Sequence, residues 1–269
     1  YKADLAVLDI LANYKWDRPI NFASLGGIGA NKGIAKYMQA EGVTYKLTPI
    51  LFPGGQGGTN TEKMYDLVMN KFLYGNMKEE GVLVDYYTLR MVQNLRMQMM
   101  KLSGALISEG QNEKAIAILD KAFEIMPIEN NQVAPDDICF SLAGNYYDAA
   151  NALLGLKLGL KKGLEKTIEK SEIEKSKIDS IKFEIDSILA MPSYAGKEIG
   201  FESKLDSLNA ELDTLNKALE KVINVIALKG KEVEGVSTLY NDAKTKGDAL
   251  GKKLALLELE KIDHYQSLN

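Results

Sequence analysis

The second half of the chain carries two apolar heptad runs, and these constrain its fold more than any other feature. In the first run, isoleucines recur every three or four residues at Ile178, Ile181, Ile185 and Ile188. The second run keeps this spacing through Leu205, Leu208, Leu212, Leu215, Leu219, Val222 and Ile226. Apolar residues at a and d positions form the seam of a coiled coil, so each run must pack against a partner helix.

A helix-breaking segment, Met-Pro-Ser-Tyr-Ala-Gly at residues 191–196, separates the two runs. Pro192 cannot continue a helix, and two helices joined by a short connection fold back antiparallel. We therefore predict a helical hairpin with a coiled-coil-like seam over residues 165–230. The alternative is two ordinary bundle helices. A last helix over residues 231–269 is predicted to pack back on the helical part.

The first half of the chain differs from the second in its content of aromatic residues and prolines. Of the 21 aromatic residues, 16 precede residue 151, as do five of the six prolines. Alternating short patterns and turns predict a small α/β domain over residues 1–85, with Pro49 favouring an edge strand. Its expected elements are helices at 4–13, 34–41 and 61–74, and strands at 20–25 and 43–52. The predicted fold class is therefore α+β and predominantly α.

Residues 86–164 are predicted to form tetratricopeptide-like helices. Helices at 86–109 and 112–126 are separated by Gly110, which suits the first position after a helix. Small and bulky residues fall where that repeat places them, although Met99 and Ser103 replace its usual Trp and Gly. These positions are Leu102, Ser103, Leu106, Ala115, Leu119, Ala122 and Pro127. A helix from Asp136 onward is the candidate first helix of a second repeat.

Composition argues against several classes of function. The net charge of -4 and the pI near 5.3 disfavour nucleic-acid binding. One Cys and one His preclude an intramolecular disulfide and a His-rich metal site. No stretch approaches the roughly 18 apolar residues of a membrane span. We expect no metal and no cofactor.

Two sequence features invite an enzymatic interpretation. The glycine-rich segment 24–33 follows a predicted strand, and such a turn can hold a dinucleotide pyrophosphate. An ordinary turn is the alternative, because the second predicted strand lacks the acidic residue that a dinucleotide fold needs. His264 would have to serve any serine-type triad, and a solvated or capping histidine is the alternative there.

Trp16, Asp17 and Arg18 stand between the first helix and the first strand. A Trp beside an Arg suits stacking and hydrogen bonding with a carbohydrate or a peptide. The alternative is a Trp that anchors the junction, with Arg18 paired to a carboxylate. Tyr37 and Tyr45 complete the set of candidate binding residues.

Four segments together suggest a family. They are LDILANYKWDRPINFA, KYMQAEGVTYKLTPI, NTEKMYDLVMNKFLYGNM and GQNEKAIAILDKAFEIMP. Over roughly residues 1–130 the chain resembles the C-terminal portion of a family of bacterial multi-pass membrane proteins of uncharacterised function. That family resembles the GT-C glycosyltransferases and is akin to protein O-mannosyltransferases. The start of the chain is typical of a segment trimmed from a longer protein.

The resemblance implies an extracytoplasmic domain on the periplasmic side of a bacterial inner membrane. Its implied partners are the membrane-embedded N-terminal part of the same protein and an acceptor protein or glycan, with no nucleic acid. No catalytic motif of the family maps onto the chain. The segment 150–240 departs from the family pattern, and our hypothesis is that it is an inserted hairpin that splits the second helical repeat.

The expected function is that of a non-catalytic accessory domain, which positions an acceptor for a glycosyltransferase-like parent. The alternatives are a protein–protein interaction or scaffold module and, third, a nucleotide-binding enzyme that uses segment 24–33. Whether the parent is an active enzyme is left open.

Overall fold

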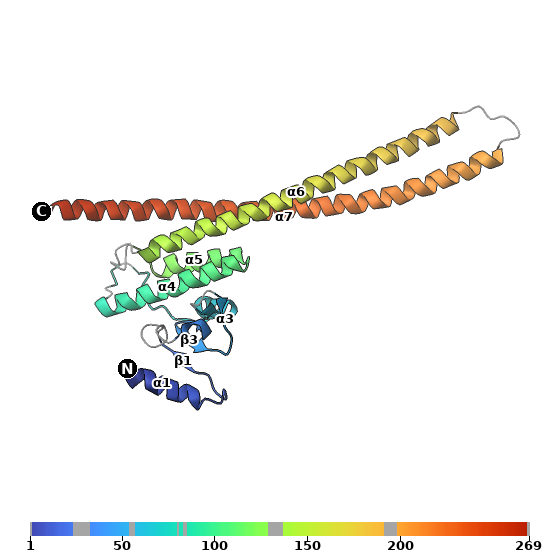
Figure 1. Cartoon of the computed structure of the whole chain (residues 1–269). Helices are drawn as coiled ribbons and strands as arrows, with labels where there is room; N and C mark the ends of the chain where they lie inside the picture. Colours follow the sequence, from blue (N-terminus) through green and yellow to red (C-terminus); the bar gives the residue numbers. More distant parts are fainter. Residues whose placement is uncertain are drawn as a thin grey trace. The chain divides into compact units, whose positions relative to one another are not determined.

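The computed structural model describes residues 2–23, 33–53, 57–79, 81–82, 85–128, 137–190 and 198–267 (Figure 1). Two compact units divide the chain. Residues Tyr1–Ala152 and Asn241–Asn269 form the first, and residues Leu153–Tyr240 form the second. A small sheet lies in the N-terminal part and long helices follow, which confirms the predicted α+β, predominantly α class.

The first unit begins with helix α1 (Lys2–Ala12) and a four-stranded sheet. The strands are β1 (Asn21–Phe22), β2 (Met38–Glu41), β3 (Thr44–Leu47) and β4 (Gly58–Thr59), in the order β1-β3-β2-β4. β3 pairs antiparallel with both β1 and β2, whereas β2 pairs parallel with β4. Met38, Ala40, Tyr45 and Leu47 turn their side chains into the core.

The predicted helix over residues 34–41 is wrong. Only the turn η1 (Ala35–Tyr37) is helical, and the following residues form β2. Burial alternates along β2, which is the pattern of a half-buried strand. Gly42 has a φ of 74°, a conformation that glycine adopts without strain, and it returns the chain directly into β3. Pairing across this tight hairpin stabilises a strand where the local sequence favoured a helical turn.

Two other boundaries also differ from prediction. Pro49 does not mark an edge strand, because β3 ends at Leu47 and lies between β1 and β2. The predicted helix 61–74 begins as expected at α3 (Thr61–Asp66), where Asn60 accepts a hydrogen bond from the Lys63 N–H. It then widens into the π-helical turn η3 (Leu67–Lys71) and ends three residues early.

Helices α4 (Tyr86–Ser108) and α5 (Asn112–Ile125) form the predicted helical pair. Gly110 separates them with a φ of 76°, as the sequence indicated. Six of the seven positions of the repeat pattern are at most 1% exposed, namely Leu102, Ser103, Leu106, Ala115, Leu119 and Ala122, and the seventh, Pro127, is half-buried. The pair therefore packs through the face that the sequence pattern indicated.

Two helices longer than predicted complete the chain. α6 (Asp137–Leu189) and α7 (Glu198–Ser267) run without the interruptions that the sequence suggested near residues 164 and 230. Neither contains a proline, and the glycines at these positions weaken a helix without stopping it. The predicted breaker at residues 191–196 lies outside the described residues.

In the first unit, the start of α6 packs against the end of α7. Cys139, Ala143 and Leu254 share one buried cluster with Ile128. The Tyr147 hydroxyl donates a hydrogen bond of 2.9 Å to Asp248. The inserted-hairpin hypothesis requires helices 137–155 and 240–265 to lie close together, and the hydrogen bond between Tyr147 and Asp248 is compatible with it, while the split repeat itself stays a prediction.

A polar network reinforces the same contact. Lys246 bridges Asp120 of α5 and Asp242 of its own helix, at 2.7 and 2.8 Å. The Tyr146 hydroxyl donates to the other oxygen of Asp120 at 2.7 Å. Burial and this carboxylate raise the pKa of Tyr146, so its hydroxyl stays protonated as a donor. Three helices are thus held together by both apolar and ionic contacts.

The second unit contains the predicted seam. Ile178 and Leu208 are buried, and the other heptad residues of both runs are half-buried. Polar groups lie at the end of the seam that is farther from the segment joining the two arms. Lys229 donates to the Thr167 hydroxyl at 2.8 Å and to the Gly163 carbonyl at 3.3 Å, and Glu174 keeps a buried oxygen without a hydrogen-bond partner. Polar groups in a seam fix the register of the pairing at some cost in stability.

Two glycines should respond in opposite ways to alanine. At Gly159, an added Cβ meets nothing within 4 Å, so Gly159→Ala should stabilise α6 by about 0.5–1 kcal/mol. At Gly57, the φ is 84° and a Cβ would lie 2.4 Å from the Met38 carbonyl oxygen, so Gly57→Ala should lower the unfolding temperature. Urea and thermal unfolding followed by circular dichroism measure both. Equal effects would contradict this assignment.

The packing of α7 on α6 in the first unit makes a second prediction. Leu254→Ala should destabilise the first unit by about 2–4 kcal/mol, because Leu254 is fully buried. Faster hydrogen exchange over residues 241–257 would locate the loss. Leu256→Ala is the matched control, since Leu256 is 60% exposed on the same helix. Equal protection in the two variants would argue against the packing of α7 on α6.

Candidate functional site

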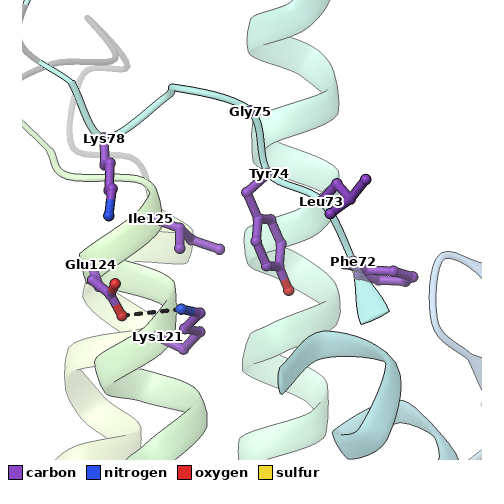
Figure 2. A pocket seen from close by; sticks show the side chains of 8 residues that line it. All are labelled: Phe72, Leu73, Tyr74, Gly75, Lys78, Lys121, Glu124 and Ile125. Carbon is purple, nitrogen blue, oxygen red and sulfur yellow. Dashed lines mark hydrogen bonds and ion pairs between the residues drawn. The ribbon is translucent and has the colours of Figure 1, made fainter. Parts of the chain in front are cut away.

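The first unit contains an open hollow, here called the Leu73 groove, with a volume of about 380 Å³ (Figure 2). Eight residues line it: Phe72, Leu73, Tyr74, Gly75, Lys78, Lys121, Glu124 and Ile125. One wall is the segment that follows η3, and the other is the end of α5. Figure 2 shows the Tyr74 ring and the Ile125 side chain pointing toward the space between these walls.

The end of the π-helical turn positions the first wall. The Phe72 N–H donates to the Leu67 carbonyl at 2.8 Å, and Phe72 itself is extended, with φ -69° and ψ 136°. The rings of Phe72 and Tyr74 pack against the core and meet edge to face, 6.3 Å apart. Leu73 between them is 98% exposed. Gly75 then turns the chain toward α5 with a φ of 61°.

Helix α5 supplies the second wall. Ile125 is buried, and Lys121 lies 3.2 Å from Glu124 one turn further along the helix. Lys78, from the crossing segment, lies on the same side of the groove as this pair (Figure 2). The groove therefore combines an apolar interior with an ionic edge that has two ammonium groups and one carboxylate.

Tyr74 presents its ring rather than its hydroxyl to the groove. The hydroxyl donates to the Val68 carbonyl of η3. Burial raises the pKa of Tyr74 to about 12, so the phenol is neutral at ordinary pH. An aromatic face beside lysine donors can hold an apolar side chain or the face of a sugar ring.

Trp16, Asp17 and Arg18 lie together in the exposed turn after α1. The rings of Tyr14 and Trp16 are 4.7 Å apart, and the Tyr14 hydroxyl donates to the Arg18 carbonyl. Trp16 is 53% exposed and has a φ of 59°, which is unusual for a residue with a side chain. The indole is accessible and also contacts Tyr14, so ligand contact and anchoring of the junction both stay predictions for Trp16.

The two predicted tyrosines lie elsewhere. Tyr37 is half-buried, with the Lys36 ammonium 5.4 Å from its ring centre. Tyr45 is buried, and its hydroxyl accepts a 2.7 Å hydrogen bond from Gln98 of α4. Neither lines the Leu73 groove, and Tyr45 fixes the sheet to α4. The roles of all five candidate residues as ligand contacts stay predictions.

Other predicted features fall outside the described part of the chain. Residues 24–32 of the glycine-rich segment are not described, and neither is the side chain of His264. Within the described ranges, no group of three or more His, Cys, Asp or Glu side chains is placed to hold a metal ion. No helix there has the length and apolar content needed to cross a membrane.

Sequence reasoning missed the Leu73 groove because residues 72–74 were predicted to continue a helix. The walls come from segments about fifty residues apart, and no local motif joins them. One local signal could have indicated that the helix ends before residue 74. The sequence Phe-Leu-Tyr-Gly at residues 72–75 ends an apolar run at a glycine, which can turn the chain.

Comparison with known protein families finds a likeness in the N-terminal part of the chain. Residues 1–67 match a family described as TMEM260-associated domain 2. No curated protein and no solved structure matches the chain. The matched residues include α1, the sheet and all of α3, whereas the groove lies just beyond them. The N-terminal part is therefore similar to a domain linked to a membrane protein.

The pKa of Tyr74 makes a prediction about pH. Because the folded-state pKa lies above the ordinary value of 10.0, this group stabilises the fold fully below pH 10. That contribution should fade as the pH rises from 10 to about 12. Tyr74→Phe should lose less thermal stability over this window than the parent chain. It should also remove one late step from the 295 nm absorbance titration, and an unchanged titration would contradict the assignment.

Proposed function

We propose that this chain is a non-catalytic accessory domain that holds an acceptor protein or glycan for a membrane glycosyltransferase-like protein. The domain would act on the periplasmic side of a bacterial inner membrane, beside the membrane-embedded part of the same protein. Its own chemistry would be recognition, with the reaction carried out by the parent.

The Leu73 groove is the observation that carries this proposal. Apolar surface from Tyr74 and Ile125 lies beside the Lys121–Glu124 pair, in a hollow of about 380 Å³. Ligand sites combine such apolar surface with a few polar groups that fix orientation. The hollow is open, which suits a segment of a larger acceptor better than a small enclosed cofactor.

The N-terminal likeness supports the membrane setting. Residues 1–67 resemble a domain named for its association with TMEM260. The glycosyltransferase activity of the parent and the periplasmic location rest on the resemblance of the four quoted sequence segments. Trp16 and Arg18 would be secondary contacts, because they lie in an exposed turn of the matched region.

A scaffold function is the second candidate. Large apolar side chains outside the seam are exposed on the helical hairpin, with Phe183 at 75%, Leu189 at 66% and Leu228 at 62%. Such residues suit contact with another helix. The seam itself gives less support to this function, because Ile178 and Leu208 are already buried and the two arms contact each other, with Lys204 2.7 Å from Glu184.

The proposal predicts that an acceptor-like probe binds in the Leu73 groove. A fluorescent, unstructured Ser/Thr-rich peptide and free mannobiose are suitable probes, followed by anisotropy and by isothermal titration. At least one should bind with a dissociation constant of about 0.1–1 mM. The double variant Leu73→Ala/Lys121→Gln should weaken that binding by about fivefold or more.

Lys182→Gln on the hairpin is the matched control, because Lys182 is an exposed lysine far along the sequence from the groove. Trp16→Phe tests whether Trp16 also contacts the probe. Because Trp16 is the one Trp of the chain, binding to this variant is followed through the fluorescence of the labelled peptide. Equal affinities for the parent chain and the groove variant, or no binding of either probe, would overturn the proposal. Concentration-dependent self-association without probe binding would favour the scaffold function.

A further inference from the structure

We propose that a groove at the far end of the helical hairpin binds a basic amphipathic helix of another protein. This groove, here called the hairpin groove, lies where α6 ends and α7 begins and has a volume of about 430 Å³ (Figure 1). Six residues line it: Ile185, Leu189, Glu202, Leu205, Asp206 and Asn209. It shares no residue with the Leu73 groove, so the inference goes beyond the accessory function.

The interior of the hairpin groove is apolar because two helices alone do not enclose their seam. Ile185 and Leu205 are seam residues, and both stay half-buried. Leu189 lines the same groove and is 66% exposed. Coiled-coil seams of this kind also form with more than two helices. A third helix laid along the groove would cover all three side chains, which is how amphipathic helices occupy apolar grooves.

Heptad positions identify the side of the hairpin on which the groove opens. With Ile185 and Leu205 at position a, Leu189, Glu202 and Asn209 all fall at position e. In an antiparallel pair the e positions of the two helices lie on the same side of the seam, and the b positions flank them. The e and b positions of both arms therefore form the rim of the groove.

This rim is strongly acidic. Its eight positions over residues 179–189 and 202–213 carry five carboxylates against one ammonium group, and all eight are exposed: Asp179, Lys182, Asp186, Leu189, Glu202, Asp206, Asn209 and Asp213. Within the described part of the hairpin, none of these carboxylates takes part in an ion pair or a side-chain hydrogen bond. The 2.7 Å ion pair between Lys204 and Glu184 joins g positions, on the other side of the seam.

The unpaired carboxylates decide which occupant fits the groove. Lysine or arginine residues beside an apolar stripe would complement the rim, and an acidic or neutral helix would not. Two copies of this side would repel each other, and so would this side and an anionic lipid surface. The occupant is therefore a helix of a different protein, with apolar residues at heptad spacing and cations next to them.

The experiment uses the full chain and three short fluorescent helical peptides. The peptides share one heptad stripe of leucines and carry Lys, Gln or Glu at the positions beside it. Anisotropy at low salt should show the Lys peptide binding about three- to tenfold more tightly than the Gln peptide, and the Glu peptide more weakly than both. These differences should contract at high salt, where exposed charges are screened.

A charge variant tests the rim. The double variant Glu202→Gln/Asp206→Asn should reduce the preference for the Lys peptide over the Gln peptide by about two- to fivefold. Glu211→Gln/Glu232→Gln is the matched control, because it removes the same charge from exposed g positions of the same helix. The control should keep the preference of the parent chain.

An apolar variant tests the interior. Leu189→Ala should weaken binding of all three peptides by about twofold or more, because it shortens a side chain that the peptide would cover. Phe183→Ala is the control, since Phe183 is 75% exposed on the same helix but does not line the groove. Both variants should keep the circular dichroism spectrum of the parent chain, because neither side chain is buried.

The outcomes distinguish this proposal from the accessory function. Absence of peptide binding, equal affinity for the three peptides, or equal effects of the rim variant and its control would overturn the basic helix. Self-association that Leu189→Ala abolishes, without peptide binding, would overturn it in favour of a second copy. The variant Leu73→Ala/Lys121→Gln should leave helix binding unchanged, so the Leu73 groove and the hairpin groove can fail independently.

Discussion

The contact between the start of α6 and the end of α7 is the interaction on which the rest of the chain depends. Tyr147 and Asp248 are 101 residues apart in sequence, yet their side chains share a hydrogen bond. Leu254 fills the buried cluster around Cys139, and Asp120 of α5 accepts hydrogen bonds from both Tyr146 of α6 and Lys246 of α7. The first unit is thus made of two stretches of chain, Tyr1–Ala152 and Asn241–Asn269, and this contact holds the two stretches together.

Periodic features of the fold could be predicted from the sequence. The heptad seam, the α4–α5 pair and Gly110 each depend on a local repeat or a local conformational preference. The strand β2 could not be predicted in the same way, because four residues carry little signal and their pairing with β3 decides their structure. The continuity of α6 was missed for a related reason. The apolar pattern changes to heptads along this segment, which suggested separate helices, whereas the glycines in it weaken the helix without ending it.

In the candidate site too, features that depend on local sequence could be predicted, and features that depend on contacts between distant segments could not. The sequence drew attention to Trp16 and Arg18 through their chemistry, and the structure places them in one exposed turn. Tyr45 was proposed for the same chemical reason, but its ring lies in the core and its hydroxyl holds Gln98. The Leu73 groove depends on where a π-helical turn ends and on which turn of α5 lies opposite. No local sequence motif indicates either of these two features, so the groove could be recognised only from the folded structure.

The polar contacts at the base of the seam have a consequence for the length of the hairpin. Lys229 reaches Thr167 and Gly163 only when the two arms pair in one register. With that register fixed, the arms beyond it can lengthen or shorten together by whole heptads, because each step of seven residues restores the same apolar face. A change of any other size would rotate the seam away from its partner. The length of the hairpin can therefore change in steps of seven residues per arm. The contacts of Lys229 at its base keep the same geometry at each of these lengths.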